Sequence, residues 1–361
     1  MNPTATLRAT GQSLWLDNIT LDLLASGTLE RYIRELSVTG LTSNPTIYDK
    51  AIEGTDAYDG QIIAGQASGL APEDLFFELA LDDLRRAADA FRPVFDRSGG
   101  VDGWVSLEVS PLLAHDMAAT VGEAIRLHAR ADRPNLFIKI PGTQAGLLAV
   151  EEAILAGVPV NVTLLFTAGH YLAAAEAYLR GIERRIEAGR DPNVASVASV
   201  FISRWDSAVA GMVPANLQTT LGLAVGRAIY AAYRRLLASD RWQRLENEGA
   251  RAQRLLFAST GTKDPKASDT LYIAGLAAPH TVNTMPEGTL LAFADHGAVG
   301  TVLPADGGDA GQVLAAFAAA GVDIEELGRR LQGDGASAFV QSWEQLLACI
   351  EEKSAIVGQS R

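Results

Sequence analysis

The chain has 361 residues, 48% of them hydrophobic, and a formal net charge of −13 at pH 7. This length suits one large domain or two ordinary ones, and the acidic charge argues against general affinity for nucleic acid or an anionic membrane. No apolar run is long enough to span a membrane, the first residues lack the apolar core of a signal peptide, and a single cysteine excludes an internal disulfide. We therefore expect a soluble, cytoplasmic protein with neither a nucleic-acid nor a membrane partner.

Short β-rich runs alternate with longer amphipathic runs, a pattern typical of a parallel sheet with crossover helices. The predicted strands are Ser13–Asp17, Gly40–Ser43, Trp104–Val109, Leu136–Ile140, Val158–Thr163, Val197–Ile202, Leu255–Ala258 and a short one near Thr281–Asn283. Eight repeats favour a closed (β/α)8 TIM barrel over residues 1–300, with additional helices. The alternative is an open doubly wound sheet, but the glycine-rich phosphate loop that usually follows its first strand is absent from the sequence after Asp17.

Helix start and stop signals lie between the predicted strands. Pro72 opens one helix at a favoured first-turn position, and Pro93 is expected to close it. Gln144–Ala156 forms another helix, which Gly157 stops at the position where glycine is preferred. Two longer helices are predicted over Thr167–Ala188 and Leu221–Leu237.

The last part of the chain, residues 301–361, is predicted to be a C-terminal helical extension packed on the barrel. Helices are expected over Gly311–Ala320, Ile324–Leu331 and Ala336–Ile350, and glycines such as Gly321 and Gly333 separate them. A small separate domain is the alternative for this region.

Lys139 lies inside the apolar run Leu136–Ile140, although lysine is scarce: the 30 basic residues include only five lysines. Arginine stays protonated, whereas a lysine in an apolar site can lose its proton. Desolvation lowers the pKa of an amine, and the free amine is the form that attacks a carbonyl group. The sequence therefore indicates a Schiff-base lysine on a buried strand, with a lysine that snorkels from a strand end as the alternative.

The active site of a barrel enzyme lies at the carboxyl ends of the strands, so the polar residues there indicate which reaction it could catalyse. They offer two acids, one amine, a cation, hydroxyls and amides: Asp17, Thr42, Ser43, Asn44, Glu108, Lys139, Asn161, Thr163, Ser199, Arg204 and Ser259. This set suits Schiff-base carbonyl chemistry, in which a lysine attacks, a carboxylate moves protons, and amides and hydroxyls hold a polyhydroxylated substrate. The five histidines show no ligand spacing, so a metal site is not expected.

Several of these residues have a purely structural alternative. Asp17 would cap a helix that begins nearby, Glu108 would be an ion-pair partner with no catalytic part, and Asn44 would serve the turn before a proline. Hydroxyls such as those of Ser199 and Thr163 are common on strands and carry no weight alone.

Several motifs occur in the order found in one known family. Residues 40–47, GLTSNPTI, resemble the G-x-T-[ST]-N-P-[ST] signature of transaldolases, and residues 135–143 resemble the segment that bears their Schiff-base lysine. Similar blocks follow at 161–166, 197–206, 256–265 and 279–286. The resemblance runs over about residues 13–295 and is strongest to the longer bacterial transaldolases with a C-terminal helical extension, common in actinobacteria.

The resemblance implies a class I aldolase-type barrel that needs no metal or other cofactor. It implies reversible transfer of a dihydroxyacetone unit between sugar phosphates in the non-oxidative pentose phosphate pathway. The donor would be sedoheptulose 7-phosphate or fructose 6-phosphate, and the acceptor glyceraldehyde 3-phosphate or erythrose 4-phosphate. Neither the residues nor the resemblance decides between a monomer and a homodimer.

The resemblance also implies a role for each residue at the strand ends. Lys139 would form the Schiff base with the donor C2 carbonyl, and Asp17 would take the proton from the C4 hydroxyl. Glu108, with Thr163 and a held water, would move protons while the imine forms. Asn44, Asn161 and Ser199 would bind substrate hydroxyls with Thr42 in support, and Arg204, Ser259 and Lys263 would meet the phosphate.

One position departs from the family pattern. Many shorter transaldolases carry an arginine two residues after the equivalent of Ser259, where this chain has Gly261. Lys263 is the nearest candidate cation, and the backbone amides of residues 260–262 would form an anion-binding nest.

Two functional alternatives stay open. One is an enzyme like fructose-6-phosphate aldolase that releases free dihydroxyacetone, and Asp17 with the cations Arg204 and Lys263 argues against it. The other is a catalytically silent barrel that acts as a binding subunit, and the intact set of Asp17, Glu108 and Lys139 argues against that.

Overall fold

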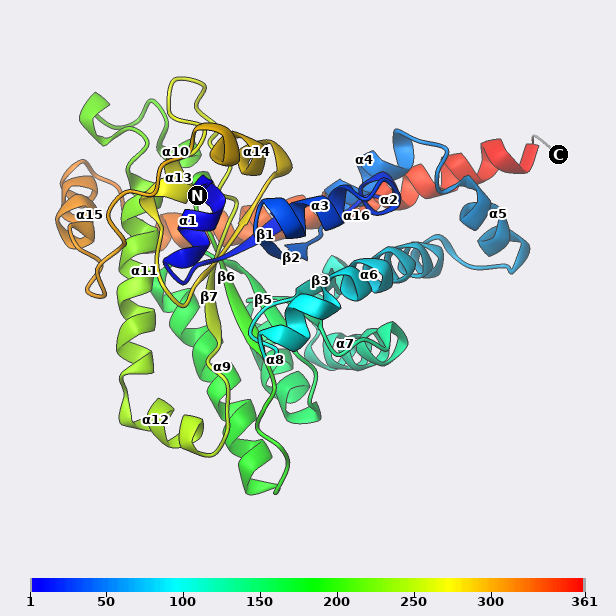
Figure 1. The fold of residues 1–361 in the computed structure, drawn as a ribbon, viewed down its shortest axis with the longest axis horizontal. Coiled ribbons are helices and arrows are strands. Elements are labelled where there is room, and N and C mark those ends of the chain that lie inside the picture. Colours follow the sequence, from blue (N-terminus) through cyan, green and yellow to red (C-terminus); the bar gives the residue numbers. More distant parts are fainter. Residues whose placement is uncertain (1, 360–361) are drawn as a thin grey trace.

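The computed structural model describes residues 2–359 and contains a closed barrel of eight parallel strands (Figure 1). Each strand pairs with the next one along the chain, and β8 closes the ring against β1. The strands are β1 (Ser13–Asp17), β2 (Val38–Thr42), β3 (Trp104–Glu108), β4 (Leu136–Pro141), β5 (Val160–Leu165), β6 (Ser196–Phe201), β7 (Arg254–Ala258) and β8 (Val282–Met285). The predicted TIM barrel is confirmed, and every predicted strand overlaps an observed one.

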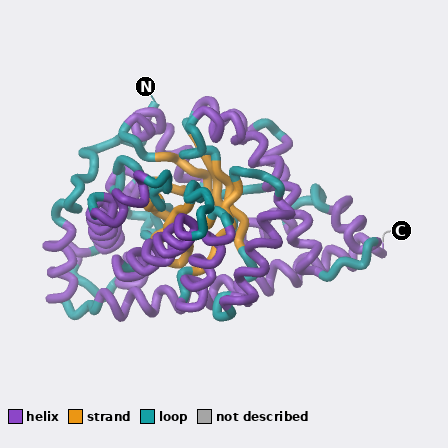
Figure 2. The backbone as a smooth tube through the Cα atoms, turned by 90° about the horizontal axis from the view of Figure 1, so that it is seen from below, coloured by secondary structure: helices purple, strands orange, loops and turns teal. Residues whose placement is uncertain are grey.

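Helices surround these strands, which lie in the middle of the molecule in Figure 2. They are α1 (Pro3–Ala9), α2 (Leu21–Ala25), α3 (Thr28–Glu35), α4 (Pro45–Glu53), α5 (Asp59–Ala67), α6 (Pro72–Arg97), α7 (Met117–Ala131), α8 (Gln144–Ala156), α9 (Ala168–Glu187), α10 (Ser203–Val209), α11 (Leu221–Leu237), α12 (Asp240–Asn247), α13 (Leu271–Gly275), α14 (Glu287–His296), α15 (Ala310–Ala319) and α16 (Ile324–Gln359). The end of α8 agrees with the prediction because Gly157 adopts a left-handed conformation, with φ of 93°. No helix within residues 2–359 is long and apolar enough to cross a membrane.

The prediction that Pro93 closes its helix is wrong, since α6 continues to Arg97. A proline inside a helix removes one backbone hydrogen bond and costs about 3 kcal/mol. The continuation buries Val94 and lays the ring of Phe95 edge-on against Trp104, with ring centres 5.2 Å apart. Burial of one large apolar side chain contributes roughly 1.5–3 kcal/mol, so two such contacts offset the cost of the proline.

The helices predicted separately over Ile324–Leu331 and Ala336–Ile350 are one continuous helix, α16. Gly333 does not interrupt it, because a glycine inside a helix costs only about 1 kcal/mol. The same helix fully buries Leu346 and Ile350, which outweighs that cost.

The helix α16 runs along α4 and α5 and also contacts α6, α10 and β5 of the barrel (Figure 1). The preceding helix, α15, packs on α11. The domain boundary predicted at residue 300 stays a prediction.

Candidate active site

Polar residues from the first five strands come together at the carboxyl end of the barrel. Asp17 pairs with Thr42 across β1 and β2. Glu108, Lys139 and Asn161 stand side by side on β3, β4 and β5, because the register pairs each with the next. The closed sheet therefore gathers an amine, a carboxyl group and an amide at one level of the barrel.

Lys139 is buried, with 6% of its surface exposed, and this excludes a lysine that snorkels to solvent. Its Nζ lies 3.2 Å from Oε2 of Glu108 and donates a hydrogen bond of 3.3 Å to the carbonyl oxygen of Ser43. An amine held against a carboxyl group inside an apolar wall has a partner for its proton and is shielded from bulk water.

Two carboxyl groups flank this lysine, the buried Glu108 and the half-buried Asp17. Burial raises the pKa of Glu108, and the positive charge of Lys139 opposes the rise. Burial also raises the pKa of Asp17, against the opposing effects of Lys139 and of the Thr42 hydroxyl. A carboxyl group whose pKa lies above its ordinary value gives up and takes back a proton more readily near neutral pH.

Glu108 forms an ion pair with Lys139, as a purely structural role would require. This ion pair uses only one of the two carboxylate oxygens. Its Oε1 is buried and has no hydrogen-bond partner among the described residues, and the same holds for Oγ1 of Thr163. Buried polar atoms are nearly always paired, so two orphaned oxygens indicate a place for polar ligand atoms.

Asp17 is oriented by a chain of hydroxyl groups. Thr42 Oγ1 donates to Asp17 Oδ1 at 2.8 Å, and Thr42 Oγ1 also lies 2.8 Å from Thr284 Oγ1. Since Thr42 gives its proton to Asp17, the proton of the second bond comes from Thr284. The helix-cap alternative for Asp17 is wrong, because Thr20 caps α2 by accepting from the backbone N–H of Leu23.

Asn161 is also oriented by hydrogen bonds, one at each polar atom of its side-chain amide. Its Nδ2 donates to Ser106 Oγ at 3.2 Å, and its Oδ1 accepts from Ser199 Oγ at 2.7 Å. Ser106 and Thr284 were not among the predicted site residues. Ser106 lies two residues before Glu108, so strand periodicity puts both on the same face and could have pointed to it.

Asn44 has the structural role expected of a residue in the turn before a proline. Its Oδ1 accepts a 3.2 Å hydrogen bond from the backbone N–H of Ile47 and so caps α4, with Pro45 in the first turn. The cap uses the amide oxygen, which leaves the Nδ2 group of the half-buried side chain as a donor.

The cation Arg204 is the second residue of α10, the helix that follows β6. Its guanidinium lies 5.1 Å from the ring centre of Phe201, in the range of a cation–π contact. Burial lowers the pKa of Arg204, and the negative charge of Asp334 on α16 opposes this. Nearby, Ser259 has a left-handed backbone, with φ of 55°, and its Oγ lies 3.0 Å from Ser203 Oγ.

Lys263 is exposed in the loop after β7, and its positive charge lowers the pKa of Asp17. Because this loop follows the carboxyl end of β7, Lys263 lies at the same end of the barrel as Asp17, which ends β1. At Gly261, an added Cβ would lie 3.1 Å from Cγ of Pro286, so an arginine at this position would require Pro286 to shift.

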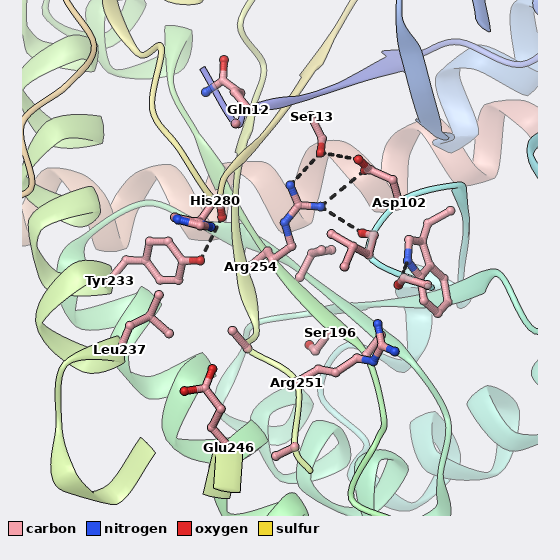
Figure 3. A pocket seen from close by; sticks show the side chains of 18 of the residues that line it. Gln12, Ser13, Asp102, Ser196, Tyr233, Leu237, Glu246, Arg251, Arg254 and His280 are labelled. Carbon is pink, nitrogen blue, oxygen red and sulfur yellow. Dashed lines mark hydrogen bonds and ion pairs between the residues drawn. The ribbon is translucent and has the colours of Figure 1, made fainter. Parts of the chain in front are cut away.

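A cavity of about 620 Å³ lies at the opposite end of the barrel (Figure 3). There Arg254 donates to Ser13 Oγ at 2.7 Å, and Asp102 accepts from Ser13 and from Arg8. These groups satisfy one another at the first residues of β1 and β7, where barrels are built for stability. None of the predicted catalytic residues lines this cavity, so its size does not mark the active site.

A buried lysine in contact with a carboxyl group, at the carboxyl end of a (β/α)8 barrel, is the arrangement of Schiff-base-forming barrel enzymes. The chain belongs to the transaldolase/fructose-6-phosphate aldolase family, whose sequence profile matches residues 14–350. The family inferred from the sequence motifs is thus confirmed.

Similar proteins share nearly the full length of this chain, and each is named transaldolase. A protein of Frankia alni is 46% identical, over 98% of this chain and 97% of its own. A protein of Parafrankia is 44% identical, over 97% of this chain and 98% of its own. One of Thermobifida fusca is 44% identical, over 98% of this chain and 99% of its own. The predicted enzyme class agrees with these names.

Proposed function

We propose that this protein reversibly transfers a dihydroxyacetone unit from sedoheptulose 7-phosphate or fructose 6-phosphate to glyceraldehyde 3-phosphate or erythrose 4-phosphate. This is a reaction of the non-oxidative pentose phosphate pathway. The observation that carries the proposal is the buried 3.2 Å contact between Lys139 Nζ and Glu108 Oε2, at the barrel end that also holds Asp17. The names of the similar proteins support the same activity.

The reaction begins at the lysine. Glu108 takes a proton from the Lys139 ammonium group, and the free amine adds to C2 of the donor sugar. The carbinolamine then loses its hydroxyl group as water, for which Glu108 returns the proton, and an iminium ion forms. The orphaned oxygens of Glu108 and Thr163 support a role in holding the water through which this proton moves.

Asp17 breaks the carbon–carbon bond. Its carboxylate removes the proton of the C4 hydroxyl, C4 becomes an aldehyde carbon, and the electrons of the C3–C4 bond pass to the iminium group to give an enamine. Attack of C3 on the acceptor aldehyde reverses these steps, with the proton returned by Asp17. The hydrogen bond from Thr42 holds the carboxylate in one orientation for both directions.

The remaining predicted residues would hold the substrate. Asn161 and Ser199 support one another and would bind hydroxyl groups of the dihydroxyacetone unit, as would the free amide donor of Asn44. The phosphate would meet Arg204, Ser259 and Lys263. The iminium group accepts the electrons of the broken bond, so the proposed reaction requires no metal or other cofactor.

The proposed residues of one chain supply every group that the reaction needs, so a monomer and a homodimer both fit the proposal. The net charge of −13 supports the absence of a nucleic-acid or membrane partner. A cytoplasmic location would follow from substrates that are phosphorylated sugars of central metabolism.

Reduction with borohydride in the presence of fructose 6-phosphate tests the proposal. It is expected to leave a dihydroxyacetone-derived adduct on the peptide that contains Lys139, because the reagent fixes the imine as a secondary amine. Peptide mass spectrometry identifies the lysine, and a sample reduced without sugar is the control. No adduct at any lysine of the folded protein would refute the proposal, and release of dihydroxyacetone without an acceptor would favour the aldolase instead.

Replacing Thr42 with valine is expected to shift the acidic limb of the pH–rate profile to higher pH. The Thr42 hydroxyl lowers the pKa of the Asp17 carboxyl group against the effect of burial, so its loss lets that pKa rise further. A higher pH is then needed to ionise the base. The measurement is kcat/KM against pH for wild type, Thr42→Val and Thr42→Ser, which keeps the hydroxyl. An acidic limb at the same pH in all three would contradict the role of Thr42.

A further inference from the structure

The helix α16 lies on the catalytic end of the barrel, where the side chain of Gln332 bonds to two backbone carbonyls of the barrel. Gln332 Nε2 donates to the carbonyl oxygen of Gly142 at 3.1 Å and to that of Leu164 at 2.9 Å. These carbonyls follow β4 and belong to β5, the strands of Lys139 and Asn161. An added Cβ at Gly335 would lie 2.9 Å from the Leu164 side chain, so the helix approaches as closely as a glycine permits.

One helical turn beyond Gly335, the half-buried side chain of Phe339 reaches the lysine. Lys139 Nζ lies 5.4 Å from the centre of the Phe339 ring, in the geometry of a cation–π contact. The amine therefore has Glu108 and the Ser43 carbonyl as polar neighbours, and an aromatic ring from α16 as an apolar one.

The position of this ring matters most at the enamine stage of the proposed reaction. C2 of the dihydroxyacetone unit is bonded to Nζ, and C3 is the next carbon, so the reactive carbon is held close to the ring. If C3 takes a proton instead of an aldehyde, the enamine becomes an iminium ion again. Water then adds to C2, and the carbinolamine breaks down to free dihydroxyacetone and the lysine amine. A phenyl ring neither donates nor accepts a proton, and it excludes the water that both steps need.

We propose that Phe339 is a specificity-determining residue, which keeps water from the lysine-bound enamine and so commits the dihydroxyacetone unit to transfer rather than release. This inference rests on the proposed function. Phe339 does not perform a chemical step; it sets the ratio of two fates of one intermediate.

The test measures that ratio in three variants of Phe339. With fructose 6-phosphate as donor, dihydroxyacetone released without acceptor is compared with transfer to erythrose 4-phosphate by the same enzyme sample. Phe339→Ala opens space for water, and Phe339→Gln brings a polar group of similar reach. Both are expected to raise the ratio of release to transfer by at least about tenfold, a change of ~1.4 kcal/mol between two barriers. Phe339→Leu keeps an apolar side chain and is expected to stay near the wild-type ratio.

A matched control is Phe95→Ala, the same truncation of a half-buried ring at the other end of the barrel, against Trp104. It removes a comparable packing contact, so a loss of folded protein alone would affect it similarly without changing the ratio. The ratio does not depend on how much of a sample is folded, since both fates are measured on the same active molecules.

Unchanged ratios in folded Phe339→Ala and Phe339→Gln would overturn the inference, as would a ratio in Phe339→Leu as high as in Phe339→Ala. Measurements on the wild-type protein distinguish a failure of this inference from a failure of the proposed function. Transfer and a borohydride adduct at Lys139 in the wild type, with unchanged variant ratios, would refute the role of Phe339 alone. Absence of both in the wild type would refute the proposed function itself.

Discussion

Replacing Lys139 with arginine is expected to abolish turnover. The guanidinium group stays protonated and cannot form an imine with the donor carbonyl, while it keeps the positive charge beside Glu108. The variant therefore removes the nucleophile without removing the charge that opposes the raised pKa values of Asp17 and Glu108. The measurement is the rate of dihydroxyacetone transfer, together with borohydride reduction in the presence of fructose 6-phosphate.

Arginine is larger than lysine, and an enlarged side chain in a packed site typically costs about 1–3 kcal/mol, so thermal melting must show that the variant is folded. Lys266→Arg is the matched control, because Lys266 is exposed in the loop after β7. It is expected to be fully active. Appreciable transfer by folded Lys139→Arg would show that another amine or another mechanism carries the reaction.

Replacing Asp17 with alanine is expected to spare imine formation but slow bond cleavage by roughly 10²–10⁴-fold, the usual contribution of a positioned general base. The lysine and Glu108 remain to form the imine, whereas the C4 hydroxyl loses the group that takes its proton. Borohydride should then trap the intact six-carbon sugar phosphate on Lys139 instead of the three-carbon unit. The mass of the modified peptide distinguishes the two adducts directly.

Asp264→Ala serves as the control for Asp17→Ala, since Asp264 is an exposed acid in the loop after β7. It is expected to give the three-carbon adduct at the wild-type rate. If Asp17→Ala also gave the three-carbon adduct without delay, the base would have to be another group, and Glu108, whose carboxylate contacts Lys139, would be the candidate.

The same carboxyl groups make the fold less stable at higher pH. Burial raises the pKa of Asp17 and Glu108 above their ordinary values, so the folded chain binds their protons more tightly than the unfolded chain does. Their contribution to stability is therefore greatest below the ordinary carboxyl pKa, and it declines as pH rises through the raised values. A site that needs ionised carboxylates in an apolar place thus works against the stability of its own barrel.

The barrel and most of the site could be predicted from sequence because both depend on local patterns. The strands follow from runs of apolar and β-branched residues, and each predicted catalytic residue lies at or near a strand end. Glu108 and Lys139 lie on successive strands, so their contact follows once neighbouring strands of a barrel are known to pair. Gly157 marked a helix end because only its own backbone conformation was involved.

The rest could not be predicted because it depends on contacts between distant segments. The helix α6 continues past Pro93 because Phe95 packs against Trp104. The helix α16 continues through Gly333 because its later turns bury Leu346 and Ile350. Thr284 supports Asp17 through Thr42, across the closure of the barrel between β8 and β1. Phe339 reaches Lys139 from 200 positions further along the chain, and no motif links the two.

The position of α16 near the carboxyl end of the chain has a consequence for biosynthesis. A ribosome delivers the amino-terminal part of a protein first, and the barrel strands and Lys139 all precede residue 286, whereas α16 begins at Ile324. Every barrel strand is therefore synthesised before the aromatic neighbour of the lysine. A chain that ends before α16 would lack the ring that lies over the amine of Lys139. Full-length synthesis is in this sense the final step of active-site assembly.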